Sequence, residues 1–105
     1  MAYKYTVRLA QSAERDIDEI LAYIAETLQN PKAAADLADE LDARFETLES
    51  QPLMFELSVN VRLRRRGYRR FPVKNYVVFY QVDEAAKAVI IARVFYGRQD
   101  YERLL

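Results

Sequence analysis

The spacing of hydrophobic positions changes twice along this chain and divides it into a strand, two helices and three further strands. In residues 3–9 the apolar side chains Tyr3, Tyr5, Val7 and Leu9 alternate with polar ones, which is typical of a half-buried strand. From residue 13 to residue 48 the apolar positions recur every three or four residues, which is the period of amphipathic helices. The last third returns to short runs rich in Val, Ile, Phe and Tyr, which predict consecutive strands.

The middle part is predicted to hold two helices, because its helical period is interrupted once. The first apolar stripe covers residues 13–28, and Ser12 is the expected N-cap. Asn30 and Pro31 end this helix and begin the next, since Asn is a favourable N-cap and Pro is favourable at the first helical position. The second stripe covers residues 34–48. So short a connection predicts that the two helices fold back on each other as an antiparallel hairpin.

The last third is predicted to form a three-stranded antiparallel meander over residues 67–73, 76–82 and 89–96. The two-residue break at Lys74 and Asn75 predicts a tight hairpin, with Asn75 expected at the positive φ that such a turn requires. The middle run is apolar on both alternating faces, so we expect it inside the sheet. Pro72 cannot donate a ladder hydrogen bond and favours an edge position for the first run.

Residues 53–66 connect the helices to the meander. Leu53, Met54, Phe55 and Leu57 are expected to pack into the core from a loop, and the alternation of Val59, Val61 and Leu63 predicts a short strand that ends at Gly67. The whole order predicts an α+β domain of two layers, in which the helical hairpin covers one face of a four-stranded, mainly antiparallel sheet. At 105 residues the chain is expected to be a single domain spanning residues 1–105.

The formal net charge is zero, but the charges are unevenly distributed. Residues 1–58 hold 12 acidic and five basic side chains, whereas residues 59–82 hold seven basic side chains and no acidic one. We therefore expect acidic helices and a basic surface on the sheet side. A solvated helix surface is sufficient to explain the acids. The basic run is either a solvated loop and edge, or a surface for phosphate or carboxylate groups, which guanidinium groups bind bidentately.

Two missing residue types limit the chemistry of the chain. It has no Cys, so neither a disulfide nor a thiolate site is expected, and it has no His, the side chain that most often transfers protons near neutral pH. The acids lie at the spacing of helix surfaces, so we expect neither a metal site nor a cofactor. No apolar run approaches the roughly 20 residues of a membrane span, and a cytoplasmic protein without membrane contact is expected.

Three phrases in the last third carry a resemblance to a known family: GYRRFPV (residues 67–73), YVVFYQVD (76–83) and RVFYGRQDY (93–101). In this order, after a strand and a helical hairpin, they resemble the RelE/ParE superfamily of toxins from type II toxin–antitoxin modules, over nearly the whole chain. The resemblance implies a toxin of a plasmid-stabilisation (addiction) module that an antitoxin holds inactive in a hetero-oligomer. The implied antitoxin is acidic and partly disordered, with a DNA-binding N-terminal half.

The branches of this superfamily differ in their target. One resembles ribosome-dependent messenger-RNA endonucleases, and the other poisons DNA gyrase without hydrolytic chemistry of its own. The ribonuclease branch carries Arg where this chain has Val77, although Arg98 after Gly97 is a feature that it shares. The chain ends in RLL, without the terminal Tyr or His-Tyr pair of that branch. The resemblance therefore favours the gyrase-directed branch, in which many relatives have His where this chain has Tyr96.

The candidate site residues are mostly arginines. The residues expected to bind the target or the antitoxin are Arg62, Arg64, Arg65, Arg66, Arg69, Arg70, Arg93, Tyr96 and Arg98. In the alternative, an RNA endonuclease, Arg70, Arg93, Tyr96 and Arg98 would be catalytic, with arginine stabilising the pentavalent phosphate and tyrosine moving protons. Tyr68 and Tyr101 stay open as further contacts. A third possibility, a nucleic-acid-binding module without toxicity, rests on the basic run alone.

Overall fold

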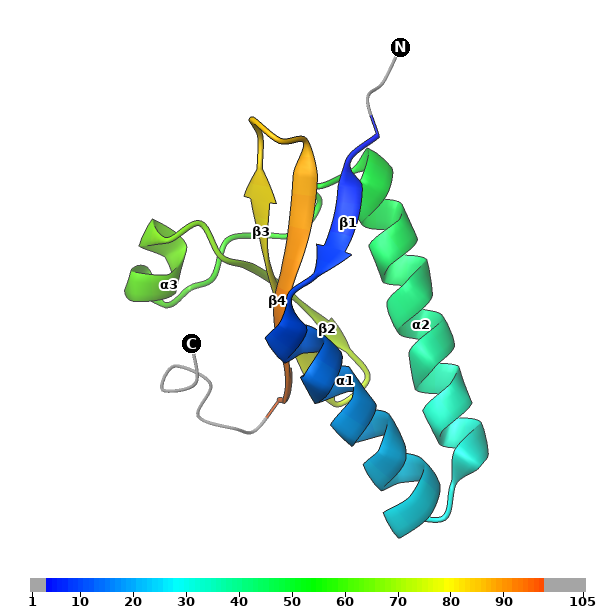
Figure 1. The fold of residues 1–105 in the computed structure, drawn as a ribbon. Helices are drawn as coiled ribbons and strands as arrows, with labels where there is room; N and C mark the ends of the chain where they lie inside the picture. Colours follow the sequence, from blue (N-terminus) through cyan, green and yellow to red (C-terminus); the bar gives the residue numbers. More distant parts are fainter. Residues whose placement is uncertain (1–3, 98–105) are drawn as a thin grey trace.

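The fold is an α+β sandwich in which a four-stranded sheet has helices on both faces (Figure 1). The computed structural model describes residues 4–97. Its elements are β1 (Thr6–Leu9), α1 (Gln11–Ala22), the π-helical turn η1 (Tyr23–Thr27), α2 (Pro31–Ser50), α3 (Val61–Arg65), β2 (Arg69–Val73), β3 (Tyr76–Asp83) and β4 (Ala88–Tyr96). The predicted order of strand, helical hairpin and meander is confirmed, and α3 is an addition to it. None of the described helices is long and apolar enough to cross a membrane.

The sheet has the strand order β1-β4-β3-β2. The meander pairs β2 with β3 and β3 with β4 antiparallel, whereas β1 lies parallel to β4. The hairpin of α1 and α2, whose helices run in opposite directions side by side, separates β1 from the meander in the sequence (Figure 1). The predicted interior place of β3 and edge place of β2 are both correct. Pro72 fits the edge because it has no N–H group to leave unpaired there.

A β-bulge in β4 decides which side chains face the helical hairpin. Phe79 pairs with Arg93 and Tyr80 pairs with Ile91, so that Ala92 has no partner in β3. An extra residue shifts the alternation of side chains by one position. Ile91 and Val94 therefore both belong to the core under α1 and α2, while Phe95 belongs to the cluster on the opposite face.

The main core lies between the sheet and the hairpin, as predicted. Leu41 and Ile24 from the helices are buried there together with Tyr80 and Ile91 from the strands. Tyr80 is fully buried, and its hydroxyl donates to the carbonyl of Pro52 at 2.9 Å, which satisfies its polar atom. Because strand residues alternate, the neighbours of Tyr80 and Val78 in β3 face the opposite side of the sheet.

The second face of the sheet is covered by α3, where a strand was predicted. Leu63 is 1% exposed and packs with Val77, Phe79 and Phe95. The helix begins because the side chain of Asn60 accepts a hydrogen bond from the amide of Leu63 at 3.0 Å, as an N-cap does. The strand prediction was wrong because a single helical turn that buries only Leu63 leaves no helical period in the sequence.

Two further local predictions differ from the structure. Ala10, not Ser12, is the N-cap of α1, and the Ser12 hydroxyl instead donates to the carbonyl of Ala92 at 3.0 Å. In the turn between β2 and β3 the positive φ, 53°, falls on Lys74 and not on Asn75. The predicted cap of α2 is correct, because Asn30 accepts from the amide of Ala33 and Pro31 begins the helix.

The connection between α2 and β2 is more exposed than expected. Phe55 does pack into the main core, where its ring stacks on Phe71 at 4.4 Å between centroids. Leu53, Met54 and Leu57 are 53%, 51% and 39% exposed, so their predicted burial is wrong. Leu9 and Leu28, which the two periodic patterns placed on inner faces, are exposed as well.

Candidate functional site

The second half of β4 has a free edge, because β1 pairs with β4 only as far as Ile91. The first turns of α1 bond to this edge in place of a strand. The Ser12 hydroxyl donates to the Ala92 carbonyl, and the Asp16 carboxylate accepts from the amide of Val94 at 3.0 Å. These two side chains satisfy backbone groups that would otherwise stay unpaired at the sheet edge.

Asp16 also forms a bidentate ion pair with Arg93. Its Oδ2 atom accepts from Nε of Arg93 at 2.7 Å, and its Oδ1 atom accepts from Nη2 at 3.0 Å. The two side chains are only 12% and 25% exposed, and the guanidinium lies 4.5 Å from the ring centroid of Phe95. The hydrogen bond from Arg93 to Asp16 raises the pKa of Arg93, so this cation stays charged and bound to its carboxylate.

Arg93 and Arg70 flank the same aromatic residue on the face that carries α3. Phe79 is paired with Arg70 of β2 on one side and with Arg93 of β4 on the other. Directly opposed residues in a sheet point to the same face, and two strand spacings separate the backbones of the two arginines by roughly 10 Å. The fold thus brings together two arginines that lie 23 positions apart in the sequence.

A groove of about 830 Å³ lies at the free edge of β4, where β3 and β4 meet the last part of α1 and η1. We call it the strand-end groove; its lining includes Tyr23, Leu28, Tyr76 and Tyr96, with Asp16 and Arg93 at its polar side. Tyr96 is 42% exposed, and its ring packs edge-on against Tyr76 at 5.8 Å between centroids. The predicted site residues Arg93 and Tyr96 therefore share one hollow.

The other predicted arginines gather around α3. We call Arg62, Arg64, Arg65, Arg66 and Arg70 the basic surface; the first three lie on α3, Arg66 caps it and Arg70 lies on the neighbouring strand. The first four side chains are exposed and Arg70 is half-buried. Within residues 4–97 the ion pairs are Lys32–Asp36, Lys87–Glu84 and Arg93–Asp16, and none of them includes a member of the basic surface.

Arg69 is separated from its neighbours by the alternation of β2. It pairs with Tyr80 and so lies toward the main core, and its Nη1 atom donates to the carbonyl of Phe55 at 2.7 Å. This arginine holds the loop before β2 in place. Tyr68 packs against the cluster under α3. Arg98 and Tyr101, the remaining predicted candidates, lie outside the described residues.

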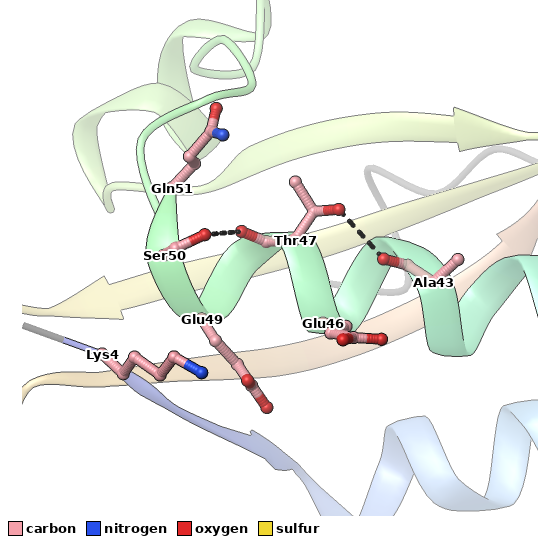
Figure 2. A pocket seen from close by; sticks show the side chains of 7 residues that line it. All are labelled: Lys4, Ala43, Glu46, Thr47, Glu49, Ser50 and Gln51. Atoms are coloured by element: carbon pink, nitrogen blue, oxygen red, sulfur yellow. Dashed lines mark hydrogen bonds between the residues drawn. The ribbon is translucent and has the colours of Figure 1, made fainter.

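A second hollow, of about 340 Å³, lies between Lys4 and the last turns of α2 (Figure 2). Its hydroxyl groups bond within the helix, since Thr47 donates to the carbonyl of Ala43 at 3.0 Å and Ser50 donates to that of Thr47 at 3.4 Å. Glu46 and Glu49 are its acidic members. No group of three or more acidic side chains among the described residues is placed to hold a metal ion.

Asp16 is the site residue that sequence reasoning missed, although a signal for it was present. Ala13, Ile17 and Ile20 mark the inner stripe of α1, and position 16 lies between them on the same face of a helix. An acid within an apolar stripe needs a partner when it is buried. Its partner Arg93 lies at the free edge of β4, a tertiary contact that the sequence does not reveal.

A parallel strand, a helical hairpin and an antiparallel meander place this protein in the class of small α+β folds with a mixed sheet, and solved structures share this fold. The chain is similar to one in the crystal structure of the toxin–antitoxin complex RelBE2 from Mycobacterium tuberculosis, with a TM-score of 0.62 and 22% identity over 89% of this chain and 98% of that one. It is also similar to a chain of the chromosomal ParDE TA system from P. aeruginosa, with a TM-score of 0.69 and 15% identity over 89% and 96% of the two chains. At these identities the likeness shows the fold.

The family follows from a match to the sequence itself. The model of the family described as "ParE toxin of type II toxin-antitoxin system, parDE" matches residues 7–101, which is most of the chain. No curated protein matches the chain significantly. The chain belongs to the ParE toxin family of type II toxin–antitoxin systems, within the RelE/ParE superfamily.

Proposed function

We propose that this toxin poisons DNA gyrase by binding and performs no hydrolytic chemistry of its own. The observation that carries the proposal is the ion pair between Arg93 and Asp16, with N–O distances of 2.7 and 3.0 Å. A metal-free ribonuclease needs a cation that is ready to meet the charge developing on a pentavalent phosphate. Arg93 is instead neutralised by a carboxylate of its own chain, so approaching phosphate oxygens would meet Asp16 as well.

The groups that would move protons also favour binding over catalysis. The chain has no His, and Tyr80, one of the two tyrosines on β3, is fully buried with its hydroxyl bonded to a backbone carbonyl. Burial raises the pKa of Tyr80, so its hydroxyl stays protonated at neutral pH and does not serve as a general base. Val77, where the ribonuclease branch carries Arg, is 8% exposed and packs in the apolar cluster under α3.

The alternative function, a ribosome-dependent messenger-RNA endonuclease, is favoured by one observation. Arg70 and Arg93 flank Phe79 on one face of the sheet, and such a pair of cations could hold two successive phosphates. In this case Arg70, Arg93, Tyr96 and Arg98 would be the catalytic groups. The ribosome would then have to position the messenger so that its phosphate displaces Asp16 from Arg93.

A cognate antitoxin is the proposed partner of this chain, in a hetero-oligomer. An acidic, partly disordered antitoxin segment is complementary to the basic surface and would order as it binds along α3 and the edge of β2. Both candidate targets would place the toxin in the cytoplasm. Expression of this gene alone should arrest growth, and co-expression of the antitoxin gene expected beside it should restore growth. Soluble expression without any effect on growth would contradict the toxin function for this chain.

Two parallel assays separate the candidate functions. Purified toxin is incubated with gyrase and supercoiled plasmid, and separately with translating ribosomes and a defined messenger. Gyrase poisoning predicts trapped, cleaved plasmid and an intact messenger. Messenger cut within ribosomes, while gyrase supercoils normally, would overturn the proposal in favour of the endonuclease.

A variant in the strand-end groove locates the contact with the target. Tyr96→Ala removes an exposed aromatic anchor, and loss of such an anchor costs about 2 kcal/mol, or roughly 30-fold in affinity. The matched control is Tyr5→Ala, because Tyr5 bonds to Glu84 near the start of β1, outside the groove. Equal loss of gyrase poisoning in both variants, at equal folded fraction, would show that the groove is not the contact.

A further inference from the structure

We infer that the basic surface binds the phosphate backbone of duplex DNA, so that the toxin contacts the DNA bound by gyrase directly. This inference rests on the proposed function, since gyrase acts on duplex DNA. It adds a ligand of a second chemical class to a toxin whose proposed target is a protein. The surface consists of Arg62, Arg64, Arg65, Arg66 and Arg70, as defined above.

The charges of this surface are not compensated within the described chain. Arg93 forms an ion pair with Asp16, and Arg69 donates a hydrogen bond to a backbone carbonyl. In contrast, none of the ion pairs within residues 4–97 includes an arginine of the basic surface. Arg65 and Arg66 follow Arg62 by three and four positions, so both are its neighbours on one side of the helical turn and are repelled by it. A polyanion relieves this repulsion, and duplex DNA carries about one charge per 1.7 Å along its axis.

The backbone that carries these arginines is fixed before any ligand binds. Leu63 anchors α3 under the sheet at 1% exposure, and Asn60 caps its first turn. The side-chain amide of Gln81 donates from Nε2 to the carbonyl of Arg66 at 2.7 Å, which ties the end of the helix to β3. Gly67 follows with a φ of 80°, which turns the chain directly into β2. The conformational entropy lost on binding should therefore come from the arginine side chains and not from the backbone.

The clustered guanidinium groups make a phosphate backbone a fitting ligand for the basic surface. Guanidinium groups bind phosphates bidentately and without reading the base sequence. Four of the five arginines are exposed and can reach such a ligand. The two hollows described above are lined by other residues, around Tyr96 and around Glu46. An acidic antitoxin segment that covered the same arginines would exclude DNA.

The test is fluorescence anisotropy of the purified full-length toxin with a labelled duplex of arbitrary sequence, without gyrase, over a series of salt concentrations. If all five arginines contact phosphates, the dissociation constant should rise about 500-fold between 50 and 200 mM salt. Substituting Arg62, Arg64 and Arg65 together with Gln leaves two contacts, for which the same change should be only about 12-fold. The matched control replaces Arg8, Arg15 and Arg44 with Gln, which removes the same charge from outside the surface.

The control triple variant should keep the wild-type salt dependence, and the triple variant on α3 should reduce it to about 12-fold. Equal loss in both variants would overturn the inference, because binding would then follow net charge alone. Absence of duplex binding at low salt would overturn it too, as would a preference for single-stranded RNA or for an acidic peptide over the duplex. The gyrase assay is read separately: cleaved plasmid without toxin–DNA binding would uphold the proposed function and reject this inference.

Discussion

Replacing Asp16 with Ala removes a side chain that ties α1 to both the backbone and a side chain of β4. In the wild type its carboxylate accepts from Nε and Nη2 of Arg93 and from the amide of Val94. The variant leaves a largely buried guanidinium without its carboxylate and a strand-edge N–H group without its acceptor. We expect a clear loss of stability and not merely a local rearrangement.

The size of this loss follows from the burial of the pair. Removing one partner of a buried ion pair costs about 3–5 kcal/mol, and an unpaired backbone amide adds about 1 kcal/mol. Arg93 is 25% exposed, so water can solvate part of its guanidinium and offset part of the loss. We therefore expect Asp16→Ala to lower the free energy of unfolding by about 3 kcal/mol, or roughly 10–20 °C in Tm. Asp16→Asn keeps an acceptor for Val94 and should lose about half as much.

Urea unfolding followed by circular dichroism measures this difference directly. Asp18→Ala on the exposed side of the same helix is the control and should change stability by less than about 0.5 kcal/mol. Arg93→Met in the Asp16→Ala background removes the unpaired charge, so the double variant should recover part of the stability. If Asp16→Ala unfolds no more readily than Asp18→Ala, the ion pair does not hold α1 on the sheet and the reasoning is refuted.

Three other predictions concern the core and the remaining arginines. Leu41→Ala should cost about 2–5 kcal/mol in thermal or urea unfolding, against less than about 0.5 kcal/mol for the exposed Val59→Ala. Burial raises the pKa of Tyr80 above its usual 10.0, so the unfolded state loses the hydroxyl proton at a lower pH than the folded state. The free energy of unfolding should therefore fall above pH 10, by up to about 1.4 kcal/mol per pH unit, and Tyr80→Phe should flatten this slope. Arg69→Gln should cost about 1–2 kcal/mol by losing its bond to a backbone carbonyl, whereas Arg64→Gln should leave stability unchanged.

Most of the fold could be predicted because its elements repeat their patterns over many residues. The stripes of α1 and α2 extend over several turns, and the alternation and turn signals of the meander are equally clear. The short α3 could not be predicted, since a single turn that buries only Leu63 has no period to detect. The N-cap of α1 also differed from the prediction. The Ser12 hydroxyl donates to the carbonyl of Ala92 in β4, and this tertiary contact overrides the preference of Ser for capping a helix.

The candidate site was predictable in composition but not in arrangement. The sequence shows an acid-free arginine run and an isolated Arg93, and it suggests that they act together. The structure separates Arg69 from Arg70 and Arg93, because β2 alternates Arg69 and Arg70 between the two faces and the bulge at Ala92 turns Arg93 toward Phe79, the partner of Arg70. A bulge changes the face of every later side chain without any reliable mark in the sequence.

The fold thus assigns different tasks to arginines that look equivalent in the sequence. Arg69 and Arg93 are bonded to a carbonyl and a carboxylate of their own chain, so their loss should appear mainly in stability. The basic surface has no such bonds in the described chain, so its loss should appear mainly in partner affinity and in salt dependence. A growth assay that scores Arg93 variants alone would therefore confuse unfolding with lost target contact. Among the arginines, those of the basic surface are not needed by the described core, so their variants report on binding.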